Sequence, residues 1–464
     1  MTRAGLLAAA GVAAAALVAA GPVAVAPAAT ARPVPAVTGH LYPGLVSAVP
    51  PTTARCRRDY GLDCYSPRQF ATAYGIDRAW ANGYAGRGRT IVVVTPFGSP
   101  TIRRDLSTFN AAFGLPEPPS FRILSPVGEI PPYDDSAERY VWALEATLDV
   151  QYAHAMAPEA DLVLVTTPVA ETQGVTGFPE IVAAENHVID RGIGDVISQS
   201  FGATEPTFRT RRSLVGLRSS FVNARRHGVT VLAASGDNGA TGRTRSGGLY
   251  PYRVSLWPAT DPLVTAVGGT RLQLDAAGRR TAPDEVWNDG SGAGGGGRSM
   301  FFQRPEFQDV VRSVVGDRRG TPDLSMSAAI DGAAVVYHSF SPGEVGYHLV
   351  GGTSLATPMF AGVVAIAAQQ RGARLGAINP ALYELGRSGL RTGIVDVTRG
   401  STTYGGVRGF PATPGYDLAS GWGTVDAAEF ATALGQQVGG RDLEGAGGAA
   451  GAACGPGCRA TTRP

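Results

Sequence analysis

The central part of the chain alternates short apolar runs with longer amphipathic segments. The apolar runs predict buried strands at residues 89–97, 160–167, 195–202, 229–237 and 262–270. The amphipathic segments predict helices at residues 101–115, 136–158, 178–191 and 208–227. Because strand and helix alternate repeatedly, we expect an α/β fold with a mostly parallel central sheet and helices on both faces. Active sites in such sheets lie at the carboxyl ends of the strands.

The two ends of the chain depart from this alternation. Residues 1–31 combine a basic start with a long Ala/Val/Leu run and small residues near its end, which predicts a secretory signal peptide cleaved after Ala31. A membrane anchor is disfavoured because the run is mostly alanine and prolines interrupt it. We expect a short leader or linker at 32–64, a globular domain at 65–437 and a flexible Gly/Ala-rich tail at 438–464. The protein is therefore expected to be secreted and extracellular, with no membrane association after signal cleavage.

Composition narrows the classes of function. With 464 residues, of which 44% are hydrophobic and 17% charged, the chain can build a sizeable core. A formal net charge of +2 gives no reason to expect nucleic acid or an anionic membrane as a partner. We expect a monomer.

The four cysteines form two close pairs, Cys56 with Cys64 and Cys454 with Cys458. Two local disulfides are the simplest of the three possible pairings, and they suit a secreted protein. A zinc site is disfavoured because a whole domain separates the pairs and no histidine lies near them.

Two carboxylates on the helix predicted at 136–158 are candidate catalytic groups. Glu145 and Asp149 are four residues apart, so both project from one face of that helix. In a water-poor cleft such a pair raises the pKa of one member and can share a proton, which gives a base able to activate a serine hydroxyl in acid. A solvated acidic pair is the alternative, but the apolar residues around the two carboxylates favour a buried helix.

Asp237 lies in the segment AASGDNGA, between two glycines and after an apolar run. An aspartate in such a turn ordinarily caps local amide groups. The alternative is a carboxyl group that stays protonated beside a reaction centre and donates a hydrogen bond to an oxyanion.

The segment GGTSLATPMFAG at 351–362 places Ser354 between a glycine turn and the start of a helix. The glycines open space, and Thr353 or Ser354 can cap the helix, which Pro358 is expected to enter in its first turn. The N–H groups and positive potential of a helix N-terminus favour a developing oxyanion. A serine that only caps the helix is the alternative.

Eight sequence blocks in a fixed order give the chain a family resemblance. They are YSPRQFATAYGI, EATLDVQYAHAMAP, DVISQSFG, AASGDNGA, WPATDPLVTAVGGT, RGTPDLSM, GGTSLATP, and DVTRG with GYDLASGWG. Together they resemble the sedolisins, or serine-carboxyl peptidases, over residues 65–437. That family has a subtilisin-like fold and replaces the histidine-based triad with Glu, Asp and Ser. None of the six histidines here is followed by the Gly-Thr that marks the subtilisin histidine.

The resemblance implies an acid-active serine-carboxyl endopeptidase that cleaves protein or peptide substrates through a serine acyl-enzyme. Glu145 is then the general base for Ser354, and Asp149 orients and tunes Glu145. Asp237 is the oxyanion-stabilising acid, working with the Ser354 backbone N–H. His154 lies nine residues after Glu145 on the same helix, so we expect a structural role for it.

The segments VDVTRG at 395–400 and TPGYDLASGWG at 413–423 resemble the calcium loop of the same family. The resemblance implies one Ca²⁺ ion. Its ligands would be the carboxylates of Asp396 and Asp417 and the carbonyls of Val397, Thr413 and Gly415. Thr413 stands where the family often has glycine, which a main-chain ligand tolerates if the backbone angles do. An Asx-turn pair that closes a loop is the alternative.

The N-terminal region departs from the family pattern. Sedolisins usually carry a long folded propeptide, whereas only residues 32–64 separate the predicted signal peptide from the globular domain. Two alternatives to the endopeptidase stay open. One is a tripeptidyl-type exopeptidase acting on free N-termini, and the other is a catalytically silent calcium-binding scaffold. The presence of all four catalytic residues disfavours the silent scaffold.

Overall fold

The structure is a computed structural model that describes residues 40–41, 47–389 and 392–451. The signal peptide predicted at 1–31 and the second cysteine pair, Cys454 with Cys458, lie outside the described residues.

The described helices are α1 (Thr53–Tyr60), α2 (Pro67–Ala73), α3 (Ile76–Ala81), α4 (Ile102–Phe113), α5 (Ala137–Met156), α6 (Phe178–Asp190), α7 (Arg211–Val215), α8 (Ser219–His227), α9 (Arg312–Val315), α10 (Thr353–Arg371), α11 (Asn379–Ser388) and α12 (Ala427–Gly451). The described strands are β1 (His40–Leu41), β2 (Cys64–Tyr65), β3 (Thr90–Pro96), β4 (Phe121–Leu124), β5 (Asp161–Thr167), β6 (Val196–Gln199), β7 (Ala203–Thr204), β8 (Thr230–Ala234), β9 (Leu256–Trp257), β10 (Thr265–Arg271), β11 (Glu285–Val286), β12 (Gly297–Gln303), β13 (Arg318–Thr321), β14 (Leu324–Ser327), β15 (Ala333–His338), β16 (Gly346–Gly351), β17 (Ile394–Val395) and β18 (Thr424–Val425).

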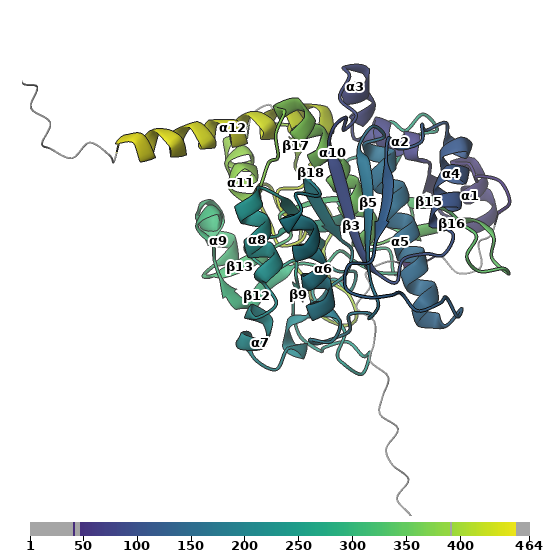
Figure 1. Ribbon diagram of the computed structural model, residues 1–464, viewed down its shortest axis with the longest axis horizontal. Coiled ribbons are helices and arrows are strands. Elements are labelled where there is room, and N and C mark those ends of the chain that lie inside the picture. The colour runs from purple at the N-terminus through teal and green to yellow at the C-terminus, as the bar shows by residue number, and fades with distance from the viewer. Residues whose placement is uncertain (1–39, 42–46, 390–391, 452–464) are drawn as a thin grey trace, which may run out of the picture. The chain divides into compact units, whose positions relative to one another are not determined.

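An eight-stranded sheet forms the centre of the domain (Figure 1). Its strand order is β11-β10-β8-β6-β3-β5-β4, with β14 pairing to β10. All of these pairs are parallel except β10 with β11. Strand β3 lies between β5 and β6, so the strand order reverses there. Ligands bind outside the carboxyl ends of the strands at such a switch point.

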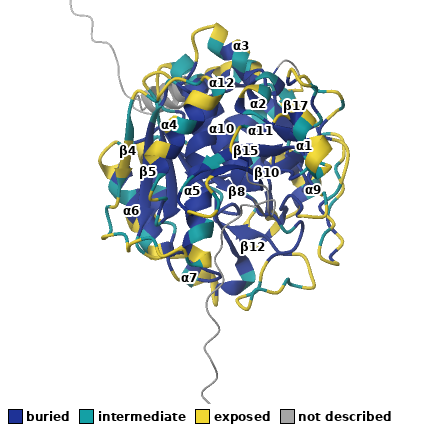
Figure 2. Ribbon diagram, turned by 90° about the vertical axis from the view of Figure 1, so that its right-hand side faces the viewer, coloured by how far each residue is buried: buried dark blue, intermediate teal, exposed yellow. Residues whose placement is uncertain are grey.

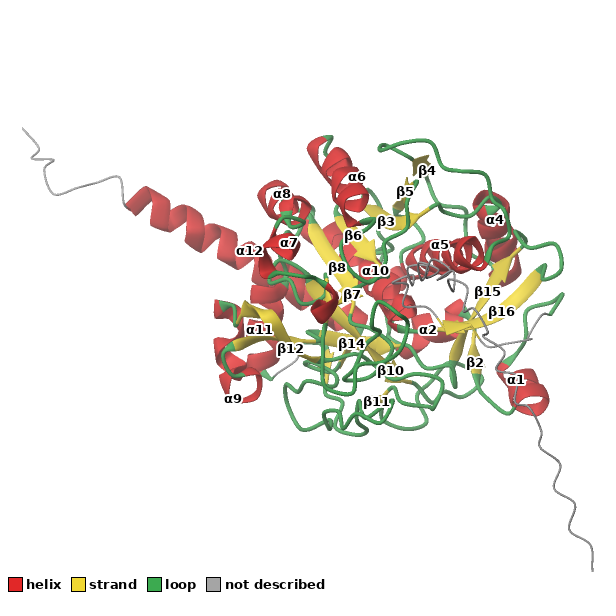
Figure 3. Cartoon of the chain, turned by 90° about the horizontal axis from the view of Figure 1, so that it is seen from below, coloured by secondary structure: helices red, strands yellow, loops and turns green. Residues whose placement is uncertain are grey.

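Helices cover both faces of this sheet, and the side chains of β3 show why. Ile91 and Val93 point into the core that contains α5 and α10, whereas Val92 and Val94 point into the core that contains α6 and α8. Alternate residues of a strand face opposite sides, so a strand covered on both sides has to be apolar throughout. Figure 3 shows the two helix layers on either side of the strands. The predicted fold class, a subtilisin-like α/β arrangement with a mostly parallel sheet, is confirmed.

A smaller sheet, in the order β1-β16-β15-β2, packs beside α5. Part of the segment predicted as a leader or linker belongs to it, because β2 pairs with β15 and α1 lies directly before β2. The predicted disulfide between Cys56 and Cys64 is present. Both cysteines are buried against Tyr347 and Leu349. This stretch is therefore packed onto the domain rather than extended away from it.

Two predicted segments have different secondary structure from the expectation. The helix expected at 208–227 is divided into α7 and α8, with Gly216 as the C-cap of α7. Glycine is a poor residue for a helix interior, which explains the break. Helix α12 continues to Gly451, into the region predicted as a flexible tail from residue 438. The alanines in this stretch favour helix and offset the glycines there.

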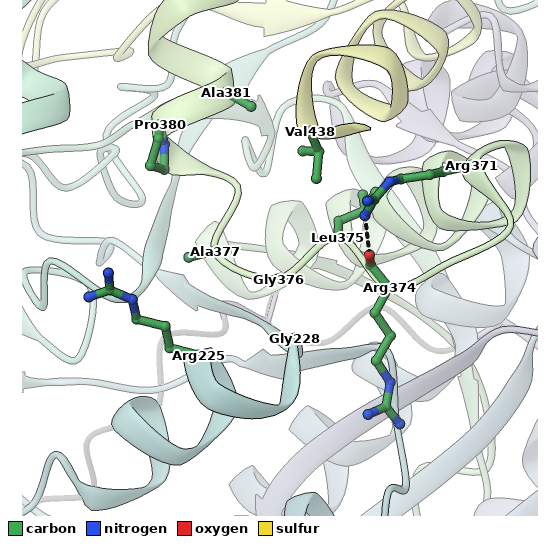
Figure 4. A pocket seen from close by; sticks show the side chains of 10 residues that line it. All are labelled: Arg225, Gly228, Arg371, Arg374, Leu375, Gly376, Ala377, Pro380, Ala381 and Val438. Carbon is green, nitrogen blue, oxygen red and sulfur yellow. Dashed lines mark hydrogen bonds between the residues drawn. The ribbon is translucent and has the colours of Figure 1, made fainter. Parts of the chain in front are cut away.

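In the described part of the chain, no helix combines the length and the hydropathy that a bilayer span requires. A pocket of about 360 Å³ lies at the amino ends of the strands, because Gly228, just before β8, forms part of its wall. Arg371 and Arg374 also line it (Figure 4). Arg374 donates hydrogen bonds to the carbonyls of Gly192 and His227. The pocket is therefore at the opposite edge of the sheet from the carboxyl ends.

Candidate active site

Helix α5 carries Glu145 and Asp149 into the interior. Every residue from Trp142 to Met156 is buried, and Figure 2 shows α5 and α10 as buried helices inside the domain. Glu145 is 2% exposed and Asp149 is 0% exposed, which excludes a solvated pair. Burial raises the pKa of Glu145 well above its usual range, and the nearby Asp149 raises it further. Burial also raises the pKa of Asp149.

The Ser354 hydroxyl reaches the first of these carboxylates. Ser354 is fully buried in the first turn of α10. Its hydroxyl lies 3.5 Å from the carbonyl oxygen of Ser200, and its proximity to the Glu145 carboxyl lowers the pKa of that carboxyl, which partly opposes the rise caused by burial. A serine hydroxyl beside a buried carboxyl group with a raised pKa is the arrangement that an acid-active nucleophile needs.

Asp237 caps the N-terminus of α10 from across the site. Its Oδ1 atom accepts hydrogen bonds from the Thr353 backbone N–H at 2.8 Å and from the Thr353 hydroxyl at 2.7 Å. The sequence predicted that Thr353 or Ser354 would supply this cap. The N-cap residue is instead Gly352, which has no side chain, and Asp237 supplies the cap. Gly352 has φ 109° and ψ 163°, a conformation that only glycine adopts without strain. The Asp237 carboxyl also raises the pKa of Glu145 through charge repulsion, which indicates that the two groups are close.

Ser200, which sequence reasoning did not assign, joins the carboxylates to the nucleophile. It follows β6 at the carboxyl edge of the sheet. Its hydroxyl lies 2.8 Å from Asp149 Oδ1 and 3.3 Å from the carbonyl oxygen of Ser354. The hydrogen bond to Asp149 lowers the pKa of that carboxyl and opposes the effect of burial. A polar residue directly after a central strand is the sequence signal that could have found it.

Pro358 explains why the Ser354 carbonyl can accept from Ser200. The proline lies inside α10, in its second turn rather than the first turn that the sequence predicted. A proline has no N–H, so the carbonyl four residues earlier loses its helical donor. That carbonyl belongs to Ser354, and the Ser200 hydroxyl lies beside it.

The glycine-rich loop at 285–299 closes over the turn that holds Asp237. Gly295 donates to the carbonyl of Gly236 at 2.7 Å, and Ser235 donates through its hydroxyl to the carbonyl of Gly295 at 2.7 Å. A Cβ atom on Gly295 would lie 2.2 Å from the carbonyl oxygen of Ser235. Glycine is required there because two backbone segments touch.

A fourth buried acid near the site, Glu171, lies in the loop after β5. Its side chain is 0% exposed, and neither carboxylate oxygen has a hydrogen-bond partner among the described residues. Burial raises the pKa of Glu171 well above its usual range. Its charge also raises the pKa of Glu145, although less than burial and Asp149 do. Sequence reasoning missed this residue because the loop carries no recognisable motif.

His154 has the contact expected of a structural histidine. Its Nε2 atom lies 2.8 Å from the carbonyl oxygen of Pro116, and the ring is fully buried near the end of α5. Burial lowers the pKa of His154 and so favours the neutral ring.

The two loops predicted to hold calcium do come together. The Gly415 N–H donates to Asp396 Oδ2 at 2.8 Å, and the Ser420 hydroxyl lies 3.4 Å from the Val397 carbonyl oxygen. In the described part of the chain no arginine or histidine forms an ion pair with either Asp396 or Asp417. Two carboxylates that form no ion pair within the described residues, on two loops that contact each other, fit the ligand chemistry of calcium.

Asp417 also has the contacts of the alternative role, that of an Asx-type turn. Its Oδ1 atom accepts from the backbone N–H groups of Ala419 at 2.9 Å and Ser420 at 2.8 Å. Its Oδ2 atom accepts from the Thr413 N–H at 2.7 Å. These bonds fix the loop shape, so the two roles of Asp417 are compatible.

The fold and the site together define the class of protein, a subtilisin-like α/β domain with a serine in the first turn of a buried helix and acidic side chains beside it. The chain belongs to the subtilase family, whose profile matches residues 143–381, and within it to the sedolisins, the serine-carboxyl peptidases. In structure it is similar to Pseudomonas sedolisin, a serine-carboxyl proteinase solved with two molecules of pseudo-iodotyrostatin. The TM-score is 0.68 at 27% identity, over 80% of this chain and 97% of that one.

The chain is also similar in sequence to three peptidases of known name. Kumamolisin of Bacillus sp. (strain MN-32) is 30% identical over 80% of this chain and 63% of its own length. Sedolisin of Pseudomonas sp. (strain 101) is 30% identical over 79% of this chain and 60% of its own length. Tripeptidyl-peptidase 1 of Homo sapiens is 28% identical over 61% of this chain and 50% of its own length. The chain thus spans between half and two thirds of the length of these relatives.

Proposed function

We propose that the protein is a secreted, acid-active serine-carboxyl endopeptidase that hydrolyses peptide bonds in proteins or peptides. The observation that carries this proposal is the placement of the Ser354 hydroxyl beside the buried Glu145 carboxyl at the N-terminus of α10. The names of the relatives support it, because sedolisin is described as a serine-carboxyl proteinase.

In the proposed reaction, Ser354 Oγ attacks the carbonyl carbon of the scissile peptide while Glu145 accepts the hydroxyl proton. The C–N bond then breaks as Glu145 passes that proton to the leaving amine, which leaves an acyl ester on Ser354. Water attacks the ester in the second half of the reaction and gives a proton to Glu145. The proton returns to Ser354 Oγ as the carboxylic acid product leaves. Asp149 holds Glu145 in place and tunes its pKa.

Asp237 is the proposed partner of the oxyanion. Two Thr353 donors hold one of its oxygens, which fixes the plane of the carboxyl group. The other oxygen, when protonated, would donate a hydrogen bond to the substrate carbonyl oxygen as negative charge develops there. The Ser354 N–H would donate a second one. A protonated Asp237 and a Glu145 able to accept a proton coexist only at low pH or with raised pKa values, so acid activity follows from this assignment.

We also propose one Ca²⁺ ion, held by Asp396, Asp417 and the carbonyls of Val397, Thr413 and Gly415. When bound, the ion would supply electrostatic cross-linking between the loops at 395–400 and 413–423. It takes no part in the chemical steps.

The test is cleavage of a denatured protein by the full chain from acidic to neutral pH, beside Ser354→Ala. The exposed serine of α9, Ser313, gives a matched control in Ser313→Ala. We expect cleavage that peaks in acid, is lost in Ser354→Ala and is retained in Ser313→Ala. A neutral optimum, or cleavage that survives Ser354→Ala, contradicts the proposal.

The second candidate is a tripeptidyl-type exopeptidase, which the similarity to tripeptidyl-peptidase 1 favours. The masses of the products separate the two. Successive losses of three residues from a free N-terminus indicate the exopeptidase, and internal cuts that persist on an N-terminally blocked peptide indicate the endopeptidase.

A further inference from the structure

The hairpin of β15 and β16 brings together three side chains that the proposed peptidase reaction does not use. His338 ends β15, Glu344 lies in the connecting turn, and His348 lies on β16. One ligand atom from each of the three lies within 4.8 Å of the other two. Val336 pairs with His348 and His338 pairs with Gly346 across the hairpin, which puts both histidines on the same face.

His338 is the unusual member of this group. Its ring is 0% exposed, and neither ring nitrogen has a hydrogen-bond partner among the described residues. A buried polar group without a partner costs free energy, and native structures rarely leave one in that state without a reason. The ring lies flat between Phe340 at 4.1 Å and His348 at 4.0 Å, measured between ring centroids.

The other two side chains have the kind of outer hydrogen-bond partners that metal ligands usually have. The Nε2 atom of His348 lies 2.8 Å from the Glu344 carbonyl oxygen. A carbonyl can only accept, so Nε2 carries the hydrogen and Nδ1 carries the lone pair. The Tyr140 hydroxyl, on α5, donates to Glu344 Oε2. Ligating histidines and carboxylates typically have such outer partners, which fix the tautomer and the orientation of the ligand.

We propose that His338, Glu344 and His348 form a binding site for one divalent transition-metal ion. Two imidazole nitrogens and one carboxylate oxygen match the ligand set of zinc sites that keep a fourth position open. Calcium is a poor match because it prefers oxygen ligands, so this site is distinct from the proposed calcium loops.

Metal binding would require a local rearrangement of the hairpin. Zinc–ligand distances of about 2.0–2.2 Å require the three ligand atoms, which lie within 4.8 Å of one another here, to converge on one point. The two stacked imidazole rings also have to swing apart, because their in-plane lone pairs cannot both face one ion while the rings are parallel. The half-buried Glu344 lies in the turn and can follow this movement. The ion would then tie the hairpin to α5 through Tyr140.

The test is a titration of untagged, calcium-saturated full chain with Zn²⁺ at neutral pH, followed by calorimetry. We expect one zinc ion per chain in the wild type. His338→Ala and His348→Ala should each weaken binding at least tenfold. His227→Ala removes an exposed histidine at the end of α8 and serves as the control that keeps wild-type affinity. Tyr140→Phe retains the ring but loses the outer hydrogen bond, and should weaken binding about tenfold.

A second measurement keeps the proposal falsifiable if the buried His338→Ala variant unfolds. Glu344→Gln changes a half-buried turn residue, and its fold can be checked by circular dichroism. Cobalt(II) bound to the wild type should give the ligand-field bands of a low-coordinate nitrogen site, and those bands should be lost in Glu344→Gln. Absence of zinc binding by the wild type, or unchanged binding in folded Glu344→Gln and His348→Ala, overturns the proposal.

Discussion

The Ser200 hydroxyl lies 2.8 Å from Asp149 Oδ1, and this contact connects strand β6 to helix α5 inside the candidate active site. The same hydroxyl lies beside the Ser354 carbonyl, which Pro358 leaves without its helical donor. Ser200 therefore touches both the carboxylate pair and the helix of the nucleophile. It lowers the pKa of Asp149 and contacts the first turn of α10 at the same time.

Replacing Ser200 by alanine should lower activity without unfolding the protein. A hydrogen bond to a charged group contributes about 1.5–3 kcal/mol, which corresponds to roughly a 10- to 100-fold loss in kcat/KM. Because the bond lowers the pKa of Asp149, its loss should also move the acidic limb of the pH profile upward. The measurement is kcat/KM against pH on a fluorogenic peptide.

Ser198→Ala is the matched control for this variant. Ser198 lies two residues earlier on β6, is equally buried, and its hydroxyl has no hydrogen-bond partner in the described part of the chain. We expect near-wild-type activity from it. Equal losses in both variants would mean that Ser200 acts only through packing.

Glu171→Gln should shift the pH profile in the opposite direction. The Glu171 carboxylate raises the pKa of Glu145 by charge repulsion, so a neutral amide at position 171 lets Glu145 lose its proton at lower pH. The acidic limb of kcat/KM should therefore move to lower pH. A profile that does not move, in a variant of unchanged fold, would refute the coupling.

Glu185→Gln provides the comparison. Glu185 is as deeply buried as Glu171, but it accepts a hydrogen bond from Gln199 and belongs to the layer of α6. It is not among the groups that raise the pKa of Glu145. We expect this variant to leave the pH profile in place.

The alternation of strands and helices could be predicted from the sequence because it depends on local periodicity. The apolar run of β3 and the helical periodicity of α5 are each long enough to indicate a single type of secondary structure. Short strands such as β4 and β2 were missed, since Phe121–Leu124 and Cys64–Tyr65 carry too few residues for a pattern.

The candidate site could be predicted where motif and chemistry agree, as at Glu145 and Ser354. The position of Ser200 after a central strand could have marked it as a candidate, but its role and that of Glu171 could not be predicted, because both come from contacts between residues far apart in the chain. The cap of α10 was assigned to the wrong residue for the same reason. Local rules place a cap within its own helix, whereas Asp237 reaches Thr353 across 116 positions.

Removal of calcium should lower thermal stability, provided that the proposed site is occupied. A ligand that binds only the folded state raises its free energy of unfolding, so the Tm should rise with added Ca²⁺ and fall with a chelator. Asp396→Asn is the informative variant. An amide can still accept from the Gly415 N–H but lacks the charge that attracts the ion.

We expect the Tm of Asp396→Asn in the presence of a chelator to match that of the wild type, and to rise less when calcium is added. Differential scanning calorimetry of both proteins in the Ser354→Ala background avoids self-digestion. A wild-type Tm that is independent of calcium contradicts the proposed ion.

The stability of the folded chain should decrease as the pH rises from acid toward neutral. Glu145, Asp149 and Glu171 have pKa values raised well above their usual range, and burial raises the pKa of Glu185 to about 7. Between the ordinary values, 4.5 for the glutamates and 3.8 for Asp149, and these raised values, the folded chain holds protons that the unfolded chain has released. Folding then takes up protons, so the free energy of unfolding falls by up to about 1.4 kcal/mol per pH unit for each group.

Urea denaturation of the Ser354→Ala protein at several pH values between 4.5 and 7 measures how the free energy of unfolding changes with pH. This range lies between the ordinary pKa of a glutamate and the raised pKa of Glu185. Glu185→Gln carries no titrating proton, so its stability should fall less steeply and exceed that of the wild type at neutral pH. The exposed Glu429 supplies the control Glu429→Gln, which should keep the wild-type slope. If wild type and Glu185→Gln lose stability in parallel, the folded state does not hold the extra proton on Glu185, and the raised pKa assigned to that buried carboxyl is wrong.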